Sequence, residues 1–167
     1  MKIVNFAEMN SELNRFVAEI RDIHIQQDRL RFRKNLERIG EVMSYEISKD
    51  FRYSEKLVTT PLGTARVNTA DDKIVIGTIL RAGIPYHQGF LNYFDRAENA
   101  FVSAYRKYKD KLNFEIFIEY IASPRIDGKI LILTDPMLAT GGSMELSYRA
   151  LLTKGEPEHI HIASVIA

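Results

Sequence analysis

One stretch of the sequence indicates the architecture of this chain: Lys129-Ile130-Leu131-Ile132-Leu133-Thr134-Asp135-Pro136-Met137-Leu138-Ala139-Thr140-Gly141-Gly142-Ser143. Residues 129–134 form an apolar run, which predicts a buried strand. Residues 144–152, Met-Glu-Leu-Ser-Tyr-Arg-Ala-Leu-Leu, predict a helix. Residues 135–143 therefore form a loop between the end of a strand and the start of a helix.

The composition of this loop suits a sugar phosphate. At the start of a helix, unpaired backbone N–H groups and the positive end of the helix dipole favour a phosphate. Gly141 and Gly142 allow the backbone to approach an anion closely, and Thr140 and Ser143 add hydroxyl donors. An ionised Asp135 only accepts hydrogen bonds, so it suits the hydroxyls of a sugar. We refer to residues 135–143 as the phosphate loop.

A surface turn followed by a helix cap is the ordinary explanation for a lone Thr-Gly-Gly. The strand before the loop, the acid at its first position and the helix after it favour a phosphate site instead. The loop has neither the Lys of a P-loop nor the G-x-G-x-x-G pattern of a dinucleotide site.

The rest of the chain has the periodicity of an α/β protein. Apolar spacing predicts helices near residues 11–22, after Asp28 and over 85–94, and turn residues in a Val- and Thr-rich segment predict a β-hairpin over 57–67. Further strands are expected over residues 73–80, 100–105, 112–121 and 158–167. Strand–helix–strand units over 74–106 and 129–166 predict a mostly parallel sheet flanked by helices.

In such sheets, ligands bind beyond the carboxyl ends of the strands. Arg81, Arg106 and Asp135 each lie just past a predicted strand end, so we expect them to gather at one edge. The ordinary role of Arg81 would be a solvated side chain, but Gly83 beside it favours close approach to a ligand. Lys107, Lys109 and Lys111 are expected to be solvated.

Length and composition predict one globular domain with no general affinity for polyanions. The chain has 167 residues, of which 46% are hydrophobic, and its net charge is +1. It has no Cys, which excludes disulfides and thiolate catalysis. No apolar run approaches the ~20 residues of a membrane span, so we expect a cytoplasmic protein. Residues 1–50 are expected to form a helical N-terminal arm, and residues 57–167 the α/β core.

The phosphate loop resembles the phosphoribosyl diphosphate (PRPP) loop of the type I phosphoribosyltransferases. Its Pro-Met-Leu-Ala-Thr-Gly-Gly motif is similar to that of the uracil branch. Three further segments resemble that branch in the same order: Arg31-Phe32-Arg33 with Tyr45-Glu46, Ile79-Leu80-Arg81-Ala82-Gly83, and Tyr105-Arg106. The resemblance implies a type I phosphoribosyltransferase-like fold with an N-terminal helical arm and a β-hairpin flap.

The resemblance also implies a function. It is the conversion of uracil and PRPP to UMP and diphosphate in pyrimidine salvage. It implies that Arg81, Ala82 and Gly83 contact the diphosphate, that Arg106 grips a phosphate from a mobile flap, and that Asp135 holds the ribose hydroxyls. The remaining PRPP-binding residues it implies are Pro136, Met137, Leu138, Ala139, Thr140, Gly141, Gly142 and Ser143.

The resemblance further implies Mg²⁺ bound mainly through PRPP, a homodimer or higher homo-oligomer, and GTP as an effector in some relatives. No metal site made by the protein itself is expected, because His159 and His161 have no other paired ligands with them. No contact with nucleic acid or membrane is expected.

The sequence departs from the family pattern at two places. It lacks the Pro-Gly-Leu-Gly-Asp type of loop that recognises uracil, so we expect the C-terminal part of the core to be incomplete and these 167 residues alone to have little or no transferase activity. It also has Glu119-Tyr120-Ile121-Ala122 where the family often has a Lys-containing stretch.

Three other functions fit the same loop. One is a PRPP-binding regulator of pyrimidine genes that binds RNA, although the near-neutral charge argues against a basic RNA face. Another is a phosphoribosyltransferase for a purine or for orotate. The third is a non-catalytic sensor of phosphosugars.

Overall fold

The structure is a computed structural model that describes residues 2–108 and 114–167 and, within them, the side chains of residues 2–104 and 118–167. The elements run in the order η1 (Phe6–Glu8), α1 (Leu13–Arg21), η2 (Ile25–Gln27), α2 (Arg29–Ser48), β1 (Tyr53–Thr60), β2 (Gly63–Ala70), β3 (Ile74–Leu80), α3 (Ile84–Tyr93), β4 (Glu98–Tyr108), β5 (Phe114–Ala122), β6 (Ile130–Thr134), α4 (Gly142–Leu152) and β7 (His159–Ala163).

Two sheets form within the described residues. The larger has five strands in the order β5-β4-β3-β6-β7, and the smaller is the β1–β2 hairpin. In the larger sheet β4, β3, β6 and β7 are parallel, and only the β4–β5 pair is antiparallel. The units β3-α3-β4 and β6-α4-β7 confirm the predicted strand–helix–strand pattern and the mostly parallel sheet.

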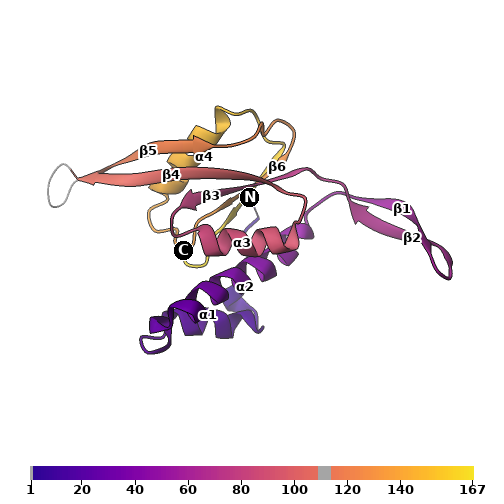
Figure 1. The fold of residues 1–167 in the computed structure, drawn as a ribbon, viewed down its shortest axis with the longest axis horizontal. Coiled ribbons are helices and arrows are strands. Elements are labelled where there is room, and N and C mark those ends of the chain that lie inside the picture. Colours follow the sequence, from indigo (N-terminus) through magenta and orange to yellow (C-terminus); the bar gives the residue numbers. More distant parts are fainter. Residues whose placement is uncertain (1, 109–113) are drawn as a thin grey trace.

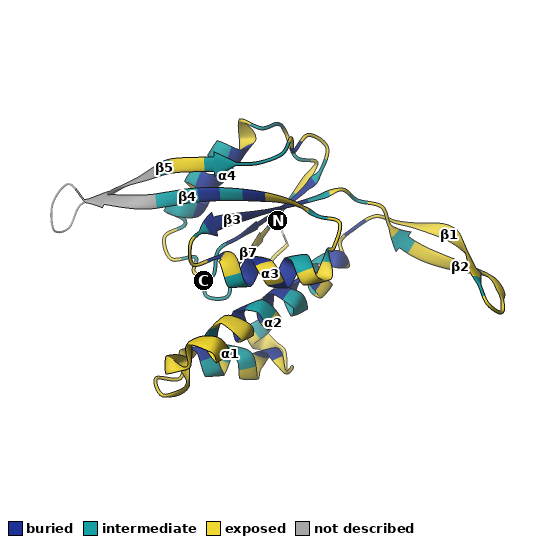
Figure 2. Ribbon diagram, viewed as in Figure 1, coloured by how far each residue is buried: buried dark blue, intermediate teal, exposed yellow. Residues whose placement is uncertain are grey.

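Helices cover both faces of this sheet (Figure 1). On one face, α4 packs over an apolar cluster that includes Val75, Leu131 and Leu133. On the other, α3 and α2 pack over a cluster that includes Ile76 and Ile132, and α1 lies outside α2. The central strands β3 and β6 are buried on both sides, which explains why their sequences are continuous apolar runs (Figure 2).

The helices α2 and α3 touch backbone to backbone at two glycines. A Cβ atom placed on Gly89 of α3 would lie 2.0 Å from the carbonyl oxygen of Glu37 in α2. A Cβ on Gly40 of α2 would lie 2.6 Å from the carbonyl oxygen of Tyr86 in α3. These glycines therefore set how closely the helical arm approaches the sheet.

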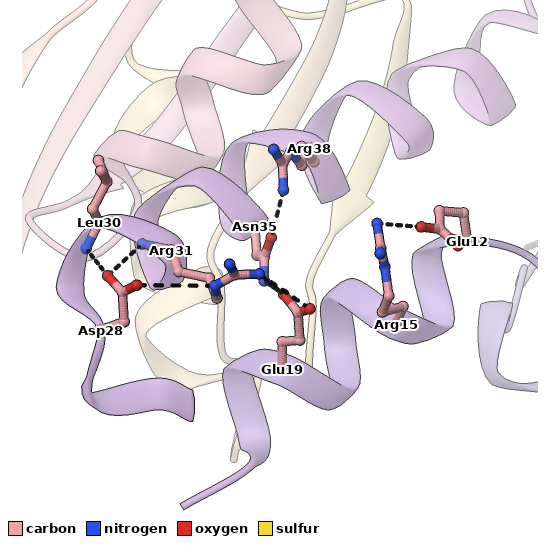
Figure 3. Close-up of polar contacts among 8 residues, drawn as sticks. All are labelled: Glu12, Arg15, Glu19, Asp28, Leu30, Arg31, Asn35 and Arg38. Atoms are coloured by element: carbon pink, nitrogen blue, oxygen red, sulfur yellow. Dashed lines mark hydrogen bonds and ion pairs between the residues drawn. The ribbon is translucent and has the colours of Figure 1, made fainter. Parts of the chain in front are cut away.

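A polar network fixes α1 against α2 (Figure 3). The carboxylate of Asp28 caps α2 by accepting hydrogen bonds at 3.0 Å from the backbone amides of Leu30 and Arg31. The carboxylate of Glu19 in α1 accepts a hydrogen bond of 2.7 Å from the Nδ2 atom of buried Asn35, and it also pairs with the Arg31 guanidinium. These contacts, the Asn35 hydrogen bond first, lower the pKa of Glu19.

The β1–β2 hairpin extends away from the body of the molecule (Figure 1), and most of its residues are exposed (Figure 2). The observed hairpin is longer than predicted, since it spans residues 53–70 rather than 57–67. No helix among the described residues has the length and apolarity that crossing a membrane requires.

The last strand is shorter than predicted. Instead of running over residues 158–167, β7 ends at Ala163. The chain then pairs with the phosphate loop through a parallel bridge between Met137 and Ile166. The sequence pattern could not show this change of partner, because it depends on where the loop lies in space.

Candidate functional site

The phosphate loop begins where β6 leaves the sheet, and its first half is held by the segment after β7. The Leu138 amide donates a hydrogen bond of 2.8 Å to the Ile166 carbonyl. The Pro136 carbonyl accepts hydrogen bonds from the Val165 and Ile166 amides at 3.2 and 3.1 Å. These backbone contacts place Asp135 beside the carboxyl end of β3, because β3 is the other neighbour of β6.

The second half of the loop forms the start of α4. Gly141 has a φ of 79°, a left-handed conformation that favours glycine, and its carbonyl accepts a hydrogen bond of 2.9 Å from the Glu145 amide. Among the hydrogen bonds between described residues, none is donated by the amides of Gly142, Ser143 or Met144. These free donors at a helix N-terminus form the kind of site that binds a phosphate group.

Asp135 lies half-buried at the base of the loop. Burial raises the pKa of its carboxyl group, and a long hydrogen bond of 3.4 Å from the Met137 amide only partly opposes this effect. The Asp135 charge also contributes to the raised pKa of Tyr86, a fully buried residue of α3 whose hydroxyl contacts Met43. The carboxylate is thus poorly solvated and has lone pairs left for hydroxyl groups of a ligand.

The turn between β3 and α3 carries Arg81. The Leu80–Arg81 peptide bond is cis. The Gly83 amide donates to the Ile79 carbonyl at 3.2 Å, and a Cβ on Gly83 would lie 2.7 Å from that oxygen, so only glycine fits this tight turn. Arg81 and Ala82 are exposed, and the turn presents them to solvent at the carboxyl end of β3.

A cavity of about 650 Å³ lies beside this turn. It is lined by the end of β3 and by neighbouring residues of β4 and β5: Leu80, Arg81, Ala82, Ser103, Ala104 and Glu119. Asp135 lies on the other side of β3, so a ligand that spans both places would cross the end of the central strand. A second cavity, of about 530 Å³, lies at the base of the hairpin and contains none of the predicted site residues.

Two buried hydroxyl groups connect the strands beneath the site. Thr78 of β3 and Thr134 of β6 are directly opposite each other, and their side-chain oxygens are hydrogen-bonded. The Thr134 hydroxyl donates to the Gly77 carbonyl at 3.1 Å, so the Thr78 hydroxyl must donate to Thr134. Thr78 lies against Gly83, and Thr134 immediately precedes Asp135. No local pattern in the sequence predicts this pair.

The structure brings Arg81 and Asp135 to the same edge of the sheet, as the sequence predicted. The prediction that Arg106 follows the end of a strand was wrong, because β4 continues to Tyr108 and Arg106 pairs with Ile116 of β5. The added length comes from antiparallel pairing with β5, which a local pattern does not reveal. The Arg106 side chain lies outside the described part of the chain, as do residues 109–111 of the segment expected to form a mobile flap over the ligand.

Comparison with known proteins points to one family. The sequence profile of the family described as uracil phosphoribosyltransferase matches residues 9–167. A uracil phosphoribosyltransferase of Porphyromonas gingivalis is 66% identical over 167 residues, which is 100% of this chain and 77% of the relative. One of Methanothermobacter thermautotrophicus is 39% identical over 138 residues, which is 81% of this chain and 63% of the relative.

Solved structures share the fold. The AQ2163 protein of Aquifex aeolicus superimposes with a TM-score of 0.78 and 28% identity, covering 94% of this chain and 85% of its own. A hypoxanthine phosphoribosyltransferase of Staphylococcus aureus superimposes with a TM-score of 0.55 and 14% identity, covering 79% of this chain and 62% of its own. The second likeness supports the α/β fold alone.

Proposed function

Because this chain belongs to the uracil phosphoribosyltransferase family, we propose that it transfers the phosphoribosyl group of PRPP to uracil and releases diphosphate. The observation that supports this proposal is that the Arg81 turn and the phosphate loop follow the neighbouring parallel strands β3 and β6 at the same end of the sheet. A ligand with a phosphate at one end and a diphosphate at the other would reach both places across the ends of the neighbouring strands β6 and β3.

Each part of the site has a proposed role. The free amides at the start of α4, with the hydroxyls of Thr140 and Ser143, bind the 5-phosphate. Asp135 accepts hydrogen bonds from the ribose 2- and 3-hydroxyls. The Arg81 guanidinium and the Ala82–Gly83 turn face the diphosphate. The remaining loop residues shape the pocket around the ribose phosphate.

The reaction depends on positioning and charge. A bond forms between uracil N1 and ribose C1 as the C1–oxygen bond to diphosphate breaks, and the diphosphate takes the electron pair while the N1 proton is released. Positive charge develops at the ribose and negative charge at the leaving oxygen. Arg81 stabilises the leaving group, and the nearby Asp135 carboxylate stabilises the electron-poor ribose.

We also propose that Mg²⁺ is bound mainly through PRPP. Within the described residues, no group of three or more His, Cys, Asp or Glu side chains is placed to hold a metal ion. The Asp135 carboxylate, an oxygen ligand with free lone pairs, fits a cation that keeps most of its bonds to substrate oxygens and water. When bound, the cation neutralises part of the diphosphate charge.

The proposed function is tested by binding and by product release. PRPP should bind in calorimetry, and any diphosphate release should depend on uracil in a panel that also includes orotate, hypoxanthine and guanine. Failure to bind PRPP would contradict the phosphoribosyltransferase proposal. PRPP binding with release driven by a different base would contradict the assignment of uracil.

Replacement of Asp135 by asparagine should change ligand affinity and stability in opposite directions. Loss of a charge-assisted hydrogen bond should weaken PRPP binding by roughly ten- to a hundredfold. Because burial raises the pKa of Asp135 above its ordinary value of 3.8, its ionisation in the folded state costs stability as the pH rises through that range. Asp135→Asn should therefore raise the melting temperature at pH 7, and the gain should shrink towards pH 4.

Calorimetry and thermal unfolding of the two proteins at both pH values provide the check. Unchanged PRPP affinity would show that Asp135 does not contact PRPP. A lower melting temperature of the variant at pH 7 would show that the ionised Asp135 carboxylate does not destabilise the fold.

We further propose that two or more copies of the chain associate through the β1–β2 hairpin. A lone two-stranded hairpin is marginal in water, yet this one exposes Leu57 at 70% and Leu62 at 100%. Light scattering after gel filtration should show an oligomer, and Leu57→Ser with Leu62→Ser should reduce it to a monomer. Thr64→Ser on the same hairpin is the matched control. A monomeric wild-type protein would refute the proposal.

A further inference from the structure

The antiparallel pairing of β4 and β5 is interrupted at Glu119. Tyr120 pairs with Ser103, and Ile118 pairs with the next residue of β4, Ala104. Glu119 therefore has no partner residue in β4, which is the arrangement of a β-bulge. Bulges redirect side chains and are common beside active sites.

The bulge changes which face of the sheet Glu119 occupies. Ile118 and Ile121 both pack against the apolar cluster under α4, although they are three positions apart. In a regular strand, residues two apart share a face. The extra residue therefore places both Glu119 and Tyr120 on the face away from α4.

On that face, Glu119 lines the 650 Å³ cavity together with Arg81 and Ala82. The Glu119 and Arg81 side chains are both exposed. The cavity thus has a cation on one wall and an anion on another. A diphosphate held by Arg81 would face this carboxylate.

The Glu119 carboxylate repels a diphosphate bound in the same cavity, and a cation between the two would relieve this repulsion. Mg²⁺ typically binds one or two carboxylates together with phosphate oxygens of a substrate. Resting on the proposed function, we propose that the Glu119 carboxylate binds a divalent cation carried by the diphosphate of PRPP. The occupant is a hard cation with oxygen ligands, because the cavity offers a carboxylate and the Ser103 hydroxyl.

This cation is distinct from one at the ribose. Glu119 lies on β5 and Asp135 follows β6, so the order of the sheet separates them by three strand spacings, roughly 14 Å in all. Metal–oxygen distances for Mg²⁺ are about 2.1 Å, so the two carboxylates are too far apart to share an ion. Glu119 therefore acts at the outer side of the diphosphate.

Diphosphate binding at several Mg²⁺ concentrations tests the proposal. Calorimetric titrations with sodium diphosphate would compare the wild-type protein, Glu119→Gln, Glu119→Lys and the control Glu156→Gln, which changes an exposed residue before β7. In the wild-type protein and the control, Mg²⁺ should strengthen binding. In Glu119→Gln this gain should fall by about tenfold or more. Glu119→Lys should bind diphosphate without Mg²⁺, because its ammonium takes the place of the cation.

A positional readout comes from Mn²⁺ in place of Mg²⁺. With diphosphate present, Mn²⁺ should broaden the NMR signals of residues near the bulge in the wild-type protein but not in Glu119→Gln. An equal Mg²⁺ dependence in the wild-type protein and Glu119→Gln would overturn the proposal. So would a loss in Glu119→Gln that is the same with and without Mg²⁺, which would mean that Glu119 only orients Arg81.

These outcomes are separate from failure of the proposed function. If the wild-type protein binds neither PRPP nor diphosphate with Mg²⁺, the phosphoribosyltransferase site itself is wrong. If it binds both and the Glu119 variants match it, only the role of Glu119 is wrong.

Discussion

Replacement of Arg81 by alanine is expected to lower kcat/KM for PRPP by about 10²- to 10³-fold, the size of effect seen when one group that stabilises transition-state charge is removed. Arg81 is the cationic residue that the described part of the chain contributes to the wall of the 650 Å³ cavity. In the site proposed above, its guanidinium binds the diphosphate, on which negative charge grows as it leaves. Steady-state kinetics with varied PRPP provide the measurement, and calorimetry with diphosphate reports the loss in the ground state.

Two further variants define what Arg81 contributes. Arg81→Lys keeps the charge but not the planar fork of donors, so its loss should be intermediate. Arg125→Ala removes an exposed arginine that pairs with Asp127 before β6, at the opposite end of the sheet, and should leave kcat/KM unchanged. A value for Arg81→Ala within a few-fold of the wild-type protein would show that the diphosphate lies elsewhere.

Replacement of Gly89 by alanine is expected to destabilise the fold by about 3 kcal/mol or more. The added Cβ would lie 2.0 Å from the Glu37 carbonyl oxygen, and this neighbour is backbone, which cannot turn aside as a side chain can. Either α2 and α3 must separate, or the helices must bend. Both changes open the apolar cluster beneath α2 and α3.

The sign of this effect discriminates between two explanations. Helix propensity alone predicts that Gly→Ala inside a helix stabilises by about 1 kcal/mol. Chemical denaturation should instead show a lower free energy of unfolding for Gly89→Ala. The control Gln88→Ala, one position earlier on the exposed side of α3, should change it by no more than about 0.5 kcal/mol. A Gly89→Ala protein as stable as the control would mean that the close helix contact does not form.

The predicted strands and helices agree with the structure in type and order because these depend on local patterns. A strand buried on both faces, such as β3 or β6, needs a continuous apolar run, and that run is visible in the sequence. A helix begins after Asp28, as predicted, because Asp28 caps α2 and capping involves only neighbouring residues. The left-handed backbone of Gly141 and the free amides at the start of α4 are also local features, because they depend on a pair of glycines between a strand and a helix.

Long-range pairing accounts for the features that sequence reasoning missed. The sequence pattern predicts that a strand ends before Arg106, because no residue near Arg106 indicates that pairing with β5 lengthens β4. The bulge at Glu119 depends on the same pairing of β4 and β5. The sequence shows that residues 119–122 depart from the family pattern, but it does not show to which face of the sheet the Glu119 side chain points. The hydroxyl pair of Thr78 and Thr134 exists only because β3 and β6 are neighbours in the sheet.

By itself, the sequence determined the order of strands and helices, the phosphate loop and the family resemblance. Apolar periodicity, helix capping and a glycine-containing loop are set by residues that are close along the chain. Only the tertiary structure decided which side chains face the cavity and which helices touch at their backbones. Those contacts join residues far apart along the chain, and their geometry depends on the register and packing of the whole sheet.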